Sequence, residues 1–486
     1  MNMPVLLGID VGTTESKVLA TSLDGEELLV HSRRTHWDHH RGGLVDTDGI
    51  ALADTVIALA AEVVHALTVG FGPVGVAGIA VTGMAEAGVL LRPDGTAEAP
   101  TIAWFDPRGQ AQLVDIPVPI ADRFPGITGL PLGPQVTAAK LLWLIASGVD
   151  LTGCTWLHLP ELIIHRLGGR AAAETSLLAR TGLLDQGTGA LWPEMLAHIG
   201  IDASLIPGQV PAGAPLGVAG GAHCPDVLRG AALTVAGHDH PVAAVGCGAI
   251  GPGEVFDSFG TAQVYLRTLT EPVDEEQRAR LVAGGVNAVR HAVPGYWHLL
   301  GGTKAGLVMR RTLALLGVTD DERRHQLDSE AVTLADRDID EIVQIRGAAN
   351  DDGVLSITAI SDEVSPAAVW LATIRHGIAE GARLLHTMTT EFGAVPSVVV
   401  AGGWTRMSSV RREKQHALPH VRFTHRAQAG AFGATAFAAF AHRSIATAGW
   451  IPTGDHESIP LSAAPTAADL DRHTATADCS LEETIV

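Results

Sequence analysis

The chain has few aromatic residues and fewer bases than acids. Phe, Trp and Tyr make up 4% of its 486 residues, and 33 Lys and Arg stand against 53 Asp and Glu, which gives a formal net charge of −20. A surface for nucleic acid or for an anionic membrane needs clustered cations, so this balance argues against both partners. Any bound phosphate must therefore be held locally, by backbone amides, one or two cations and a metal ion.

Cysteine is also scarce, and the P-loop fingerprint is missing. The four cysteines lie far apart without a C-x-x-C pair, which is typical of reduced thiols and argues against a disulfide framework or an iron–sulfur cluster. G-x-x-x-x-G-K-[ST] does not occur, and the glycine segment AGGWTR at residues 401–406 does not fit G-x-G-x-x-G, so P-loop and Rossmann folds lose their main supports. We see no apolar run long enough to span a membrane and no export signal, so we expect a cytoplasmic protein.

Apolar material, by contrast, is plentiful. Hydrophobic residues make up 47% of the chain and mean hydropathy is +0.23, and the length exceeds what one core usually organises, so we predict two large domains. Residues 5–21 read as strand, turn and strand, and the plan returns near residue 255 in VFDSFGTAQVYL. We interpret this as a structural duplication around a cleft, with mixed sheets flanked by helices. The predicted boundaries are 1–248, 249–441 and an irregular tail at 442–486.

The first of these turns, in IDVGTTESK at residues 9–17, allows two interpretations. It is either an ordinary hairpin turn or a phosphate cradle, in which Thr13, Thr14 and Lys17 face an anion and Asp10 holds a hydrated divalent cation. Gly260 and Thr261 stand in the equivalent place of the second strand pair. This favours two turns gripping one polyphosphate.

The tetrapeptide GHDH at residues 237–240 is the most reactive-looking stretch. Asp239 fits a general base at the head of a helix over 241–246. Alternatively, the His-x-His spacing fits the zinc site of a metal-dependent hydrolase, which would need further ligands. His36, His39 and His40 are available, but they lie in a hydrophilic stretch typical of a solvated loop.

A third stretch, WFDPR at residues 104–108, combines an aromatic face, a carboxylate and a guanidinium. Trp104, Asp106 and Arg108 suit a polyhydroxylated ligand, although a salt bridge beside a tryptophan would give the same pattern. Glu86, after a buried strand, is a candidate for the same pocket. Gly402 and Gly403 follow another strand, where glycines let the backbone lie flat against a planar group.

Taken in order from residue 6 to about 441, these motifs resemble the FGGY family of carbohydrate kinases, within the sugar kinase, Hsc70 and actin superfamily. The resemblance is carried by GIDVGTTESK, WFDPR, TAAKLLWL, ETSLLARTGLLDQGTG, AGHDH, SFGTA, GGTKAG and AGGWTRMSS. It implies an α/β fold of two ribonuclease H-like (actin-like ATPase) domains around a catalytic cleft, the first for sugar and phosphate and the second for nucleotide.

The resemblance also implies the reaction. A kinase of this family would use ATP and Mg²⁺ to phosphorylate a hydroxyl of a small ketose or alditol, here of four to six carbons, with Asp239 as base and Asp10 positioning the metal. The implied sugar contacts are Glu86, Trp104, Asp106, Arg108, Asp239 and His240. The implied phosphate and nucleotide contacts are Thr13, Thr14, Lys17, Gly260, Thr261, Gly302, Gly306, Gly402 and Gly403.

The sequence departs from the family pattern in places. Trp404 stands where relatives often carry a small residue, Met407 near their Ser or Asn, and Ala85-Glu86 where xylulokinases have Met-His. The metal-dependent hydrolase and a non-catalytic sugar-binding protein on the same fold remain as alternatives. The expected partner is a small sugar or polyol, and a homodimer is possible.

Overall fold

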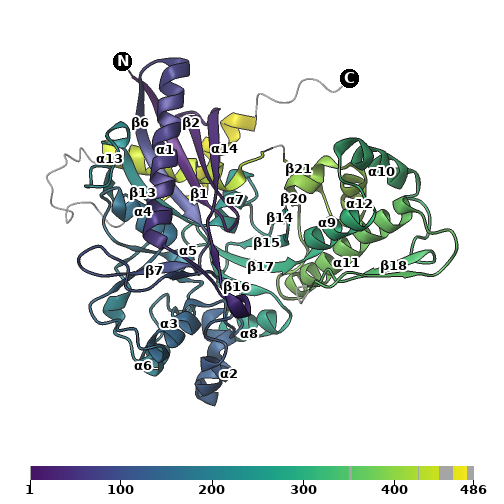
Figure 1. Ribbon diagram of the computed structural model, residues 1–486, viewed down its shortest axis with the longest axis horizontal. Helices are drawn as coiled ribbons and strands as arrows, with labels where there is room; N and C mark the ends of the chain where they lie inside the picture. Colours follow the sequence, from purple (N-terminus) through teal and green to yellow (C-terminus); the bar gives the residue numbers. More distant parts are fainter. Residues whose placement is uncertain (1, 350–352, 425, 448–463, 479–486) are drawn as a thin grey trace.

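The computed structural model describes residues 2–349, 353–424, 426–447 and 464–478, which form two lobes (Figure 1). Each lobe is built around a six-stranded sheet. The first lobe holds the N-terminal part of the chain and its last helices, and the second lobe holds most elements between residues 255 and 424 (Figure 1).

The first sheet has the order β12-β13-β6-β1-β2-β3. Strands β1, β2 and β3 form an antiparallel meander, while β6 and β13 run parallel to β1. Their bounds are β1 (Met3–Val11), β2 (Glu15–Ser22), β3 (Glu27–Arg34), β6 (Val74–Gly83), β12 (Gly217–Val218) and β13 (Ala232–His238).

The second sheet, β16-β17-β15-β14-β20-β21, repeats this plan. β14 pairs antiparallel with β15, β15 with β17, and β20 and β21 run parallel to β14. The predicted duplication is confirmed, and each copy opens on the strand–turn–strand seen in the sequence. The bounds are β14 (Val255–Phe259), β15 (Gln263–Leu269), β16 (Asn287–Arg290), β17 (Trp297–Thr303), β20 (Val398–Ala401) and β21 (Val421–Phe423).

Helix α1 (Gly49–Phe71) covers one face of the first sheet. The Asp48 carboxylate accepts from the amides of Ile50 and Ala51, which caps the helix. α1 is long and apolar enough to cross a membrane by length and composition, so the expectation that no such run exists is wrong. Its apolar side nevertheless packs with α4 (Leu159–Arg166) into the core of the first lobe.

The other face of the first sheet is covered by α7 (Asp239–Gly246) and α13 (Ala429–Thr447), with α14 (Ala467–Asp478) outside them. A Cβ on Gly8 of β1 would come within 1.9 Å of the Ala431 carbonyl oxygen, so α13 lies directly on the strand. The chain therefore returns to the first lobe after the second. Assigning residues up to 441 to the second domain was wrong for α13, and the tail is not irregular throughout, because α14 is helical.

The remaining elements surround these layers. In the first lobe they are β4 (Asp38–His39), β5 (Val45–Thr47), β7 (Gly88–Leu91), β8 (Thr101–Ile102), α2 (Val118–Thr128), α3 (Thr137–Ala146), β9 (Thr155–His158), β10 (Ala173–Glu174), α5 (Thr175–Leu178), α6 (Pro193–Ile199) and β11 (Gln209–Val210). In the second they are α8 (Glu275–Ala283), α9 (Ala305–Leu315), α10 (Asp321–Thr333), β18 (Val343–Arg346), β19 (Ser356–Ala359), α11 (Pro366–Phe392) and α12 (Ser408–Ala417).

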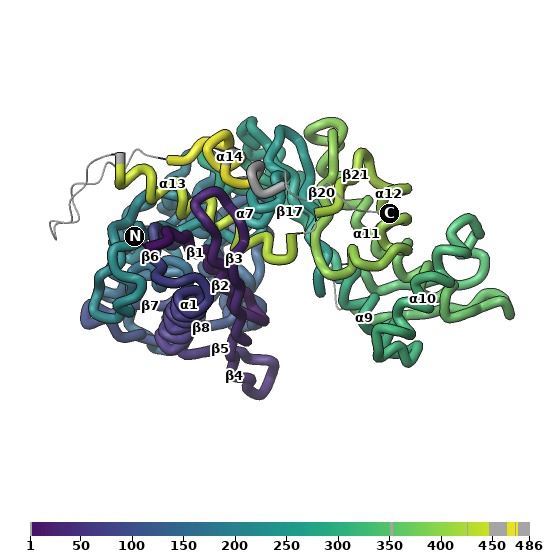
Figure 2. The backbone as a smooth tube through the Cα atoms, turned by 90° about the horizontal axis from the view of Figure 1, so that it is seen from above, coloured from purple at the N-terminus to yellow at the C-terminus, as the bar shows by residue number. Residues whose placement is uncertain are grey.

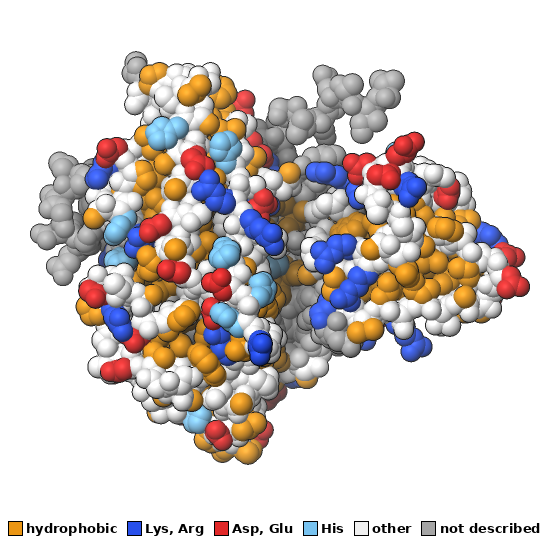
Figure 3. Space-filling view, in the orientation of Figure 1, with side chains coloured by type: hydrophobic (Ala, Val, Ile, Leu, Met, Phe, Trp, Pro, Cys, Tyr) orange, Lys and Arg blue, Asp and Glu red, His pale blue; other side chains and the backbone are white. Residues whose placement is uncertain are grey.

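Two core clusters span both lobes. One joins Val242 and Val245 of α7 to Phe256 and Leu266 of the second sheet, and the other joins Val289 of β16 to residues of the first lobe. Figure 2 shows α7 between the strands of the first sheet and those of the second. Figure 3 shows that the molecular surface is hollowed between the lobes.

Candidate active site

The predicted catalytic residues lie at the carboxyl ends of three neighbouring parallel strands. Val11 of β1 pairs with Gly83 of β6, and Gly83 pairs with His238 of β13. The chain segments that carry Asp10, Glu86 and Asp239 therefore leave the sheet at one edge. In open α/β sheets, ligands bind at this edge.

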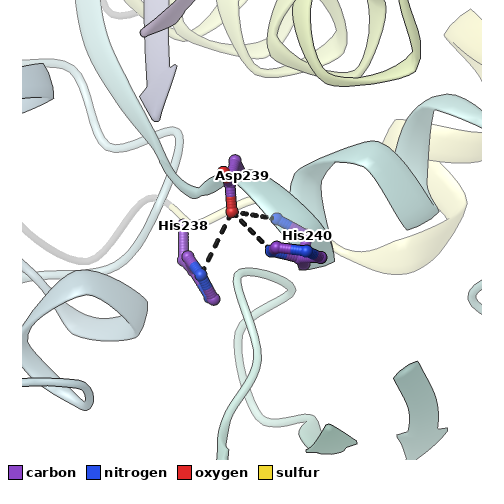
Figure 4. A group of neighbouring side chains, drawn as sticks. All are labelled: His238, Asp239 and His240. Carbon is purple, nitrogen blue, oxygen red and sulfur yellow. Dashed lines mark hydrogen bonds and ion pairs between the residues drawn. The ribbon is translucent and has the colours of Figure 1, made fainter. Parts of the chain in front are cut away.

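Asp239 begins α7, and its carboxylate is held between two histidines (Figure 4). Its Oδ1 accepts from the His240 amide at 2.7 Å and lies 2.7 Å from His240 Nδ1 and 3.1 Å from His238 Nε2. Burial would raise the pKa of Asp239, but the two histidines outweigh burial and hold the pKa well below its usual value. Asp239 is therefore ionised at neutral pH.

Asp10 has the opposite environment. Its Oδ1 is buried without a hydrogen-bond partner in the described part of the chain. Burial, and then the negative charge of Asp239, raise the pKa of Asp10 to about 7, against the smaller lowering effects of Lys17 and His240. The structure thus brings Asp10 and Asp239 together as predicted. An unpartnered carboxylate oxygen beside a second acid fits a hydrated divalent cation.

The first turn is fixed by two tryptophans. Trp104 Nε1 donates to Thr13 Oγ1 at 2.9 Å, and Trp37 Nε1 donates to the Thr13 carbonyl at 2.7 Å. Lys17 stands opposite Asp10 on β2, with its Nζ 3.6 Å from a Glu15 carboxylate oxygen. Thr14 at the tip of the turn is exposed. Trp104, a predicted sugar contact, therefore binds directly to the first turn.

Glu86 pairs with a residue that sequence reasoning missed. Arg180, just after α5, places its Nε and Nη2 each 2.8 Å from Glu86 Oε1. Both groups act electrostatically on His240, so they lie in the same site as Asp239. The only sequence signal was an arginine inside the otherwise apolar run SLLARTGLL.

Asp106 and Arg108 are not presented as sugar ligands. The Asp106 carboxylate is fully buried and accepts from the Val45 amide and from the Arg108 amide, Nε and Nη2. Arg108 also bonds Asp46 and the Val45 carbonyl. Burial would raise the pKa of Asp106, and its bonds to Arg108 and Val45 lower the pKa overall. Because every acceptor site is used internally, the predicted direct sugar contact is wrong in this structure; the pair anchors the segment that carries Trp104.

In the second lobe the predicted glycines gather around the second turn. A Cβ on Gly306 would lie 1.9 Å from the Gly260 carbonyl oxygen and 2.8 Å from that of Thr261, and one on Gly402 would lie 2.2 Å from that of Phe259. Trp404 Nε1 donates to the Gly260 carbonyl at 2.9 Å. Only glycine fits these contacts, which draw β14, α9 and the segment after β20 together. Gly302 lies on β17 opposite Val264, and Gly403 is exposed.

Two histidines of the second lobe also reach the site, and neither was foreseen. The His298 ring lies 6.3 Å from the His238 ring and 5.5 Å from that of His291, centroid to centroid. Burial above all holds the pKa of His298 well below its usual value and lowers that of His291 to about 3. The neutral His298 ring of β17 therefore packs near His238, and the neutral His291 ring, just after β16, packs near His298.

His36 and His40 do not join this cluster. They pair with Asp38 and Asp46 at the edge of the first lobe. Among described residues, the group of side chains close enough to share a metal ion is His238, Asp239 and His240, whose ligand atoms lie within 4.8 Å of one another. The extra ligands that a zinc hydrolase needs are not supplied by the earlier histidines.

The duplicated sheet and the facing acids define a two-domain actin-like ATPase fold, and solved structures share it. Glycerol kinase from Plasmodium falciparum, solved with ADP, is 16% identical and has a TM-score of 0.80 over 100% of this chain and 99% of that one. Xylulose kinase from Rhodospirillum rubrum is 21% identical and has a TM-score of 0.76 over 98% of this chain and 97% of that one.

Sequence comparison gives the family. Residues 5–246 match the model of the N-terminal domain of the FGGY family of carbohydrate kinases. Glycerol kinase from Thermus brockianus is 29% identical over 293 residues, which span 56% of each chain. Xylulose kinase from Streptomyces rubiginosus is 26% identical over 340 residues, or 68% of this chain and 64% of the relative. The chain belongs to the FGGY family of carbohydrate kinases.

Proposed function

We propose that this protein transfers the γ-phosphoryl group of ATP to a hydroxyl of a small ketose or alditol of four to six carbons. One observation carries the proposal: Asp10 on β1 and Asp239 just after β13 lie at the same carboxyl edge of the first sheet, with Asp239 ionised and the Asp10 Oδ1 without a hydrogen-bond partner among the described residues. Phosphoryl transfer needs these two roles, a group that accepts the hydroxyl proton and a group that positions a metal ion. Relatives named as glycerol, xylulose and apulose kinases support the reaction class.

Asp239 is the proposed general base. It accepts the proton of the attacking hydroxyl, and His238 and His240 hold its carboxylate in place. Two hydrogen-bonded histidines make this carboxylate a weak base, but the loose transition state of phosphoryl transfer demands little base strength. His240, Glu86 and Trp104 are the proposed sugar contacts, because they border the same edge.

Asp10 is the proposed position of Mg²⁺, where its unpartnered Oδ1 would take a metal-bound water. The ion, when bound, would neutralise charge on the phosphates. Thr13, Thr14 and Lys17 would hold phosphates from the first lobe, and Gly260 and Thr261 from the second. Gly306 and Gly402 pack closely against the backbone of the second turn, with no side chain between them and it. These two residues, together with Gly302 and Gly403, form the proposed nucleotide contacts.

We also place the protein in the cytoplasm, because its four cysteines lie far apart in the sequence without a C-x-x-C pair, which is typical of reduced thiols.

The test is an ADP-release screen with ATP and Mg²⁺ across ketoses and alditols of both hands. Sugar-dependent ADP release, with a phosphorylated product seen by mass spectrometry, supports the proposal. ADP release that no acceptor stimulates would contradict it. The hydrolase alternative predicts stoichiometric zinc in the purified protein, which elemental analysis measures.

A further inference from the structure

We propose that the Glu86–Arg180 pair selects neutral polyols and ketoses against acidic sugars such as aldonates, with Arg180 as the residue that positions Glu86. The inference rests on the proposed kinase function and adds a charge rule to it. The FGGY family assignment alone carries no such rule, because it names no acceptor for this chain.

The geometry leaves Glu86 one free oxygen. Arg180 Nε and Nη2 both bind Oε1 at 2.8 Å. Within the described ranges, Glu86 Oε2 accepts no hydrogen bond. Both side chains are largely buried, at 8% exposed for Glu86 and 13% for Arg180. The guanidinium therefore fixes the position of the carboxylate, while Oε2 remains an acceptor without a donor among the described residues.

The charges around the site favour a donor from the ligand. Glu86 and Arg180 both act on His240, which bonds Asp239, so the free oxygen borders the space next to the base. Arg180 pairs with Glu86 through Nε and Nη2, and its Nη1 is buried without a hydrogen-bond partner in the described part of the chain. A hydroxyl can donate to Oε2. A carboxylate there would face two like charges, Glu86 and Asp239.

The experiment compares matched pairs of equal carbon number: ribitol with ribonate, xylitol with xylonate and glucitol with gluconate. Both kcat/KM and calorimetric affinity are measured, so the rule is tested even where turnover is slow. The wild type should prefer the best neutral acceptor to its aldonate by about 100-fold or more. Equal or stronger use of the aldonate overturns the inference and leaves the kinase proposal standing. Failure of every acceptor to stimulate ADP release counts against the kinase proposal, and the affinities then decide the charge rule alone.

Three variants assign the selection to the pair. Glu86→Gln keeps the shape and removes the charge, so the preference should fall at least tenfold. Arg180→Gln should raise KM for the polyol by about tenfold or more with little change in KM for ATP, and Arg180→Lys should recover only part, because lysine lacks the fork that binds Oε1. The matched control is Arg166→Gln, which breaks the Arg166–Asp54 pair on the surface of the same lobe and should leave both readouts unchanged. An unaltered polyol-to-aldonate ratio in Glu86→Gln would refute the role of the pair.

Discussion

The surroundings of Asp239 and Asp10 shift the pKa values of their carboxyl groups in opposite directions. Histidines on both sides of Asp239 favour its charged form, whereas Asp10 is buried near that charge and its Oδ1 has no hydrogen-bond partner among the described residues. Divergent environments of this kind separate a proton acceptor from a partner group in many active sites. Each half of the arrangement can be tested with a single-atom change.

Asp239→Asn should abolish phosphoryl transfer and leave ligand affinity largely intact. The amide keeps the shape of the carboxylate but cannot take the hydroxyl proton, so kcat should fall by about 100-fold to 10,000-fold. Steady-state kinetics with calorimetric binding of sugar and nucleotide separate the two effects. Near-normal turnover would remove Asp239 from the base role.

Asp10→Asn should change stability in a pH-dependent way. With its pKa raised in the folded state from 3.8 to about 7, Asp10 destabilises the fold progressively as pH rises from about 4 to about 7, because folding must hold a proton or bury a charge. In EDTA the variant should therefore be more stable than the wild type at pH 8, by up to about 4 kcal/mol, and equal to it near pH 4. Thermal unfolding at both pH values measures this difference.

Added Mg²⁺ supplies the control for that experiment. It should stabilise the wild type at pH 8 and have little effect on Asp10→Asn, since the amide carries no charge for the ion to offset. An equal shift in both proteins would place the ion elsewhere.

At the scale of elements, the Asp106–Arg108 pair fastens the segment after β8 to β5. Asp106→Asn breaks a fully buried network, so it should lower the unfolding free energy by about 3–5 kcal/mol. Because the pair also anchors the segment that carries Trp104, sugar affinity measured below the unfolding temperature should weaken more than ATP affinity. Asp54→Asn, at a half-exposed carboxylate paired with Arg166, is the control and should cost about 1 kcal/mol or less. Unchanged sugar affinity in Asp106→Asn would show that the pair does not support the sugar contact of Trp104.

The contact of α13 with β1 depends on a missing side chain. Gly8→Ala would drive a Cβ into the Ala431 carbonyl, which is backbone and cannot rotate away. We expect destabilisation of about 1–3 kcal/mol and faster amide exchange in α13. Gly70→Ala in α1, where nothing lies within 4 Å, should be neutral or slightly stabilising. Equal behaviour of the two variants would show that α13 does not seat on Gly8.

At the scale of the whole molecule, local signals predicted well and distant ones did not. Both strand–turn–strand units and the helix headed by Asp239 follow from patterns a few residues long. The return of α13 to the first sheet depends on Gly8 meeting Ala431, residues more than four hundred positions apart, and no local pattern reports such a contact. Arg180 and His298 were missed for the same reason, because only the fold shows what they face. Asp106 and Arg108 were predicted as sugar contacts because the same sequence pattern fits an internal salt bridge and a pair of ligand-binding side chains.

The hollow between the lobes leads us to expect that the two lobes close on bound ligands. The lobes are joined beside α7 and also at a second place, where the Ala288 amide donates to the Gly129 carbonyl and Arg278 Nε donates to the Gly126 carbonyl. Away from these contacts the surface between the lobes is hollowed (Figure 3). A kinase must keep water from the phosphoryl group, and domain closure does this. Small-angle scattering of Asp239→Asn with ATP and sugar, a mixture that should not turn over, should show a smaller radius of gyration than either ligand alone. Unchanged dimensions with both ligands bound would mean that the site is sealed by local movements of the two turns, because the lobes then keep one arrangement throughout the reaction.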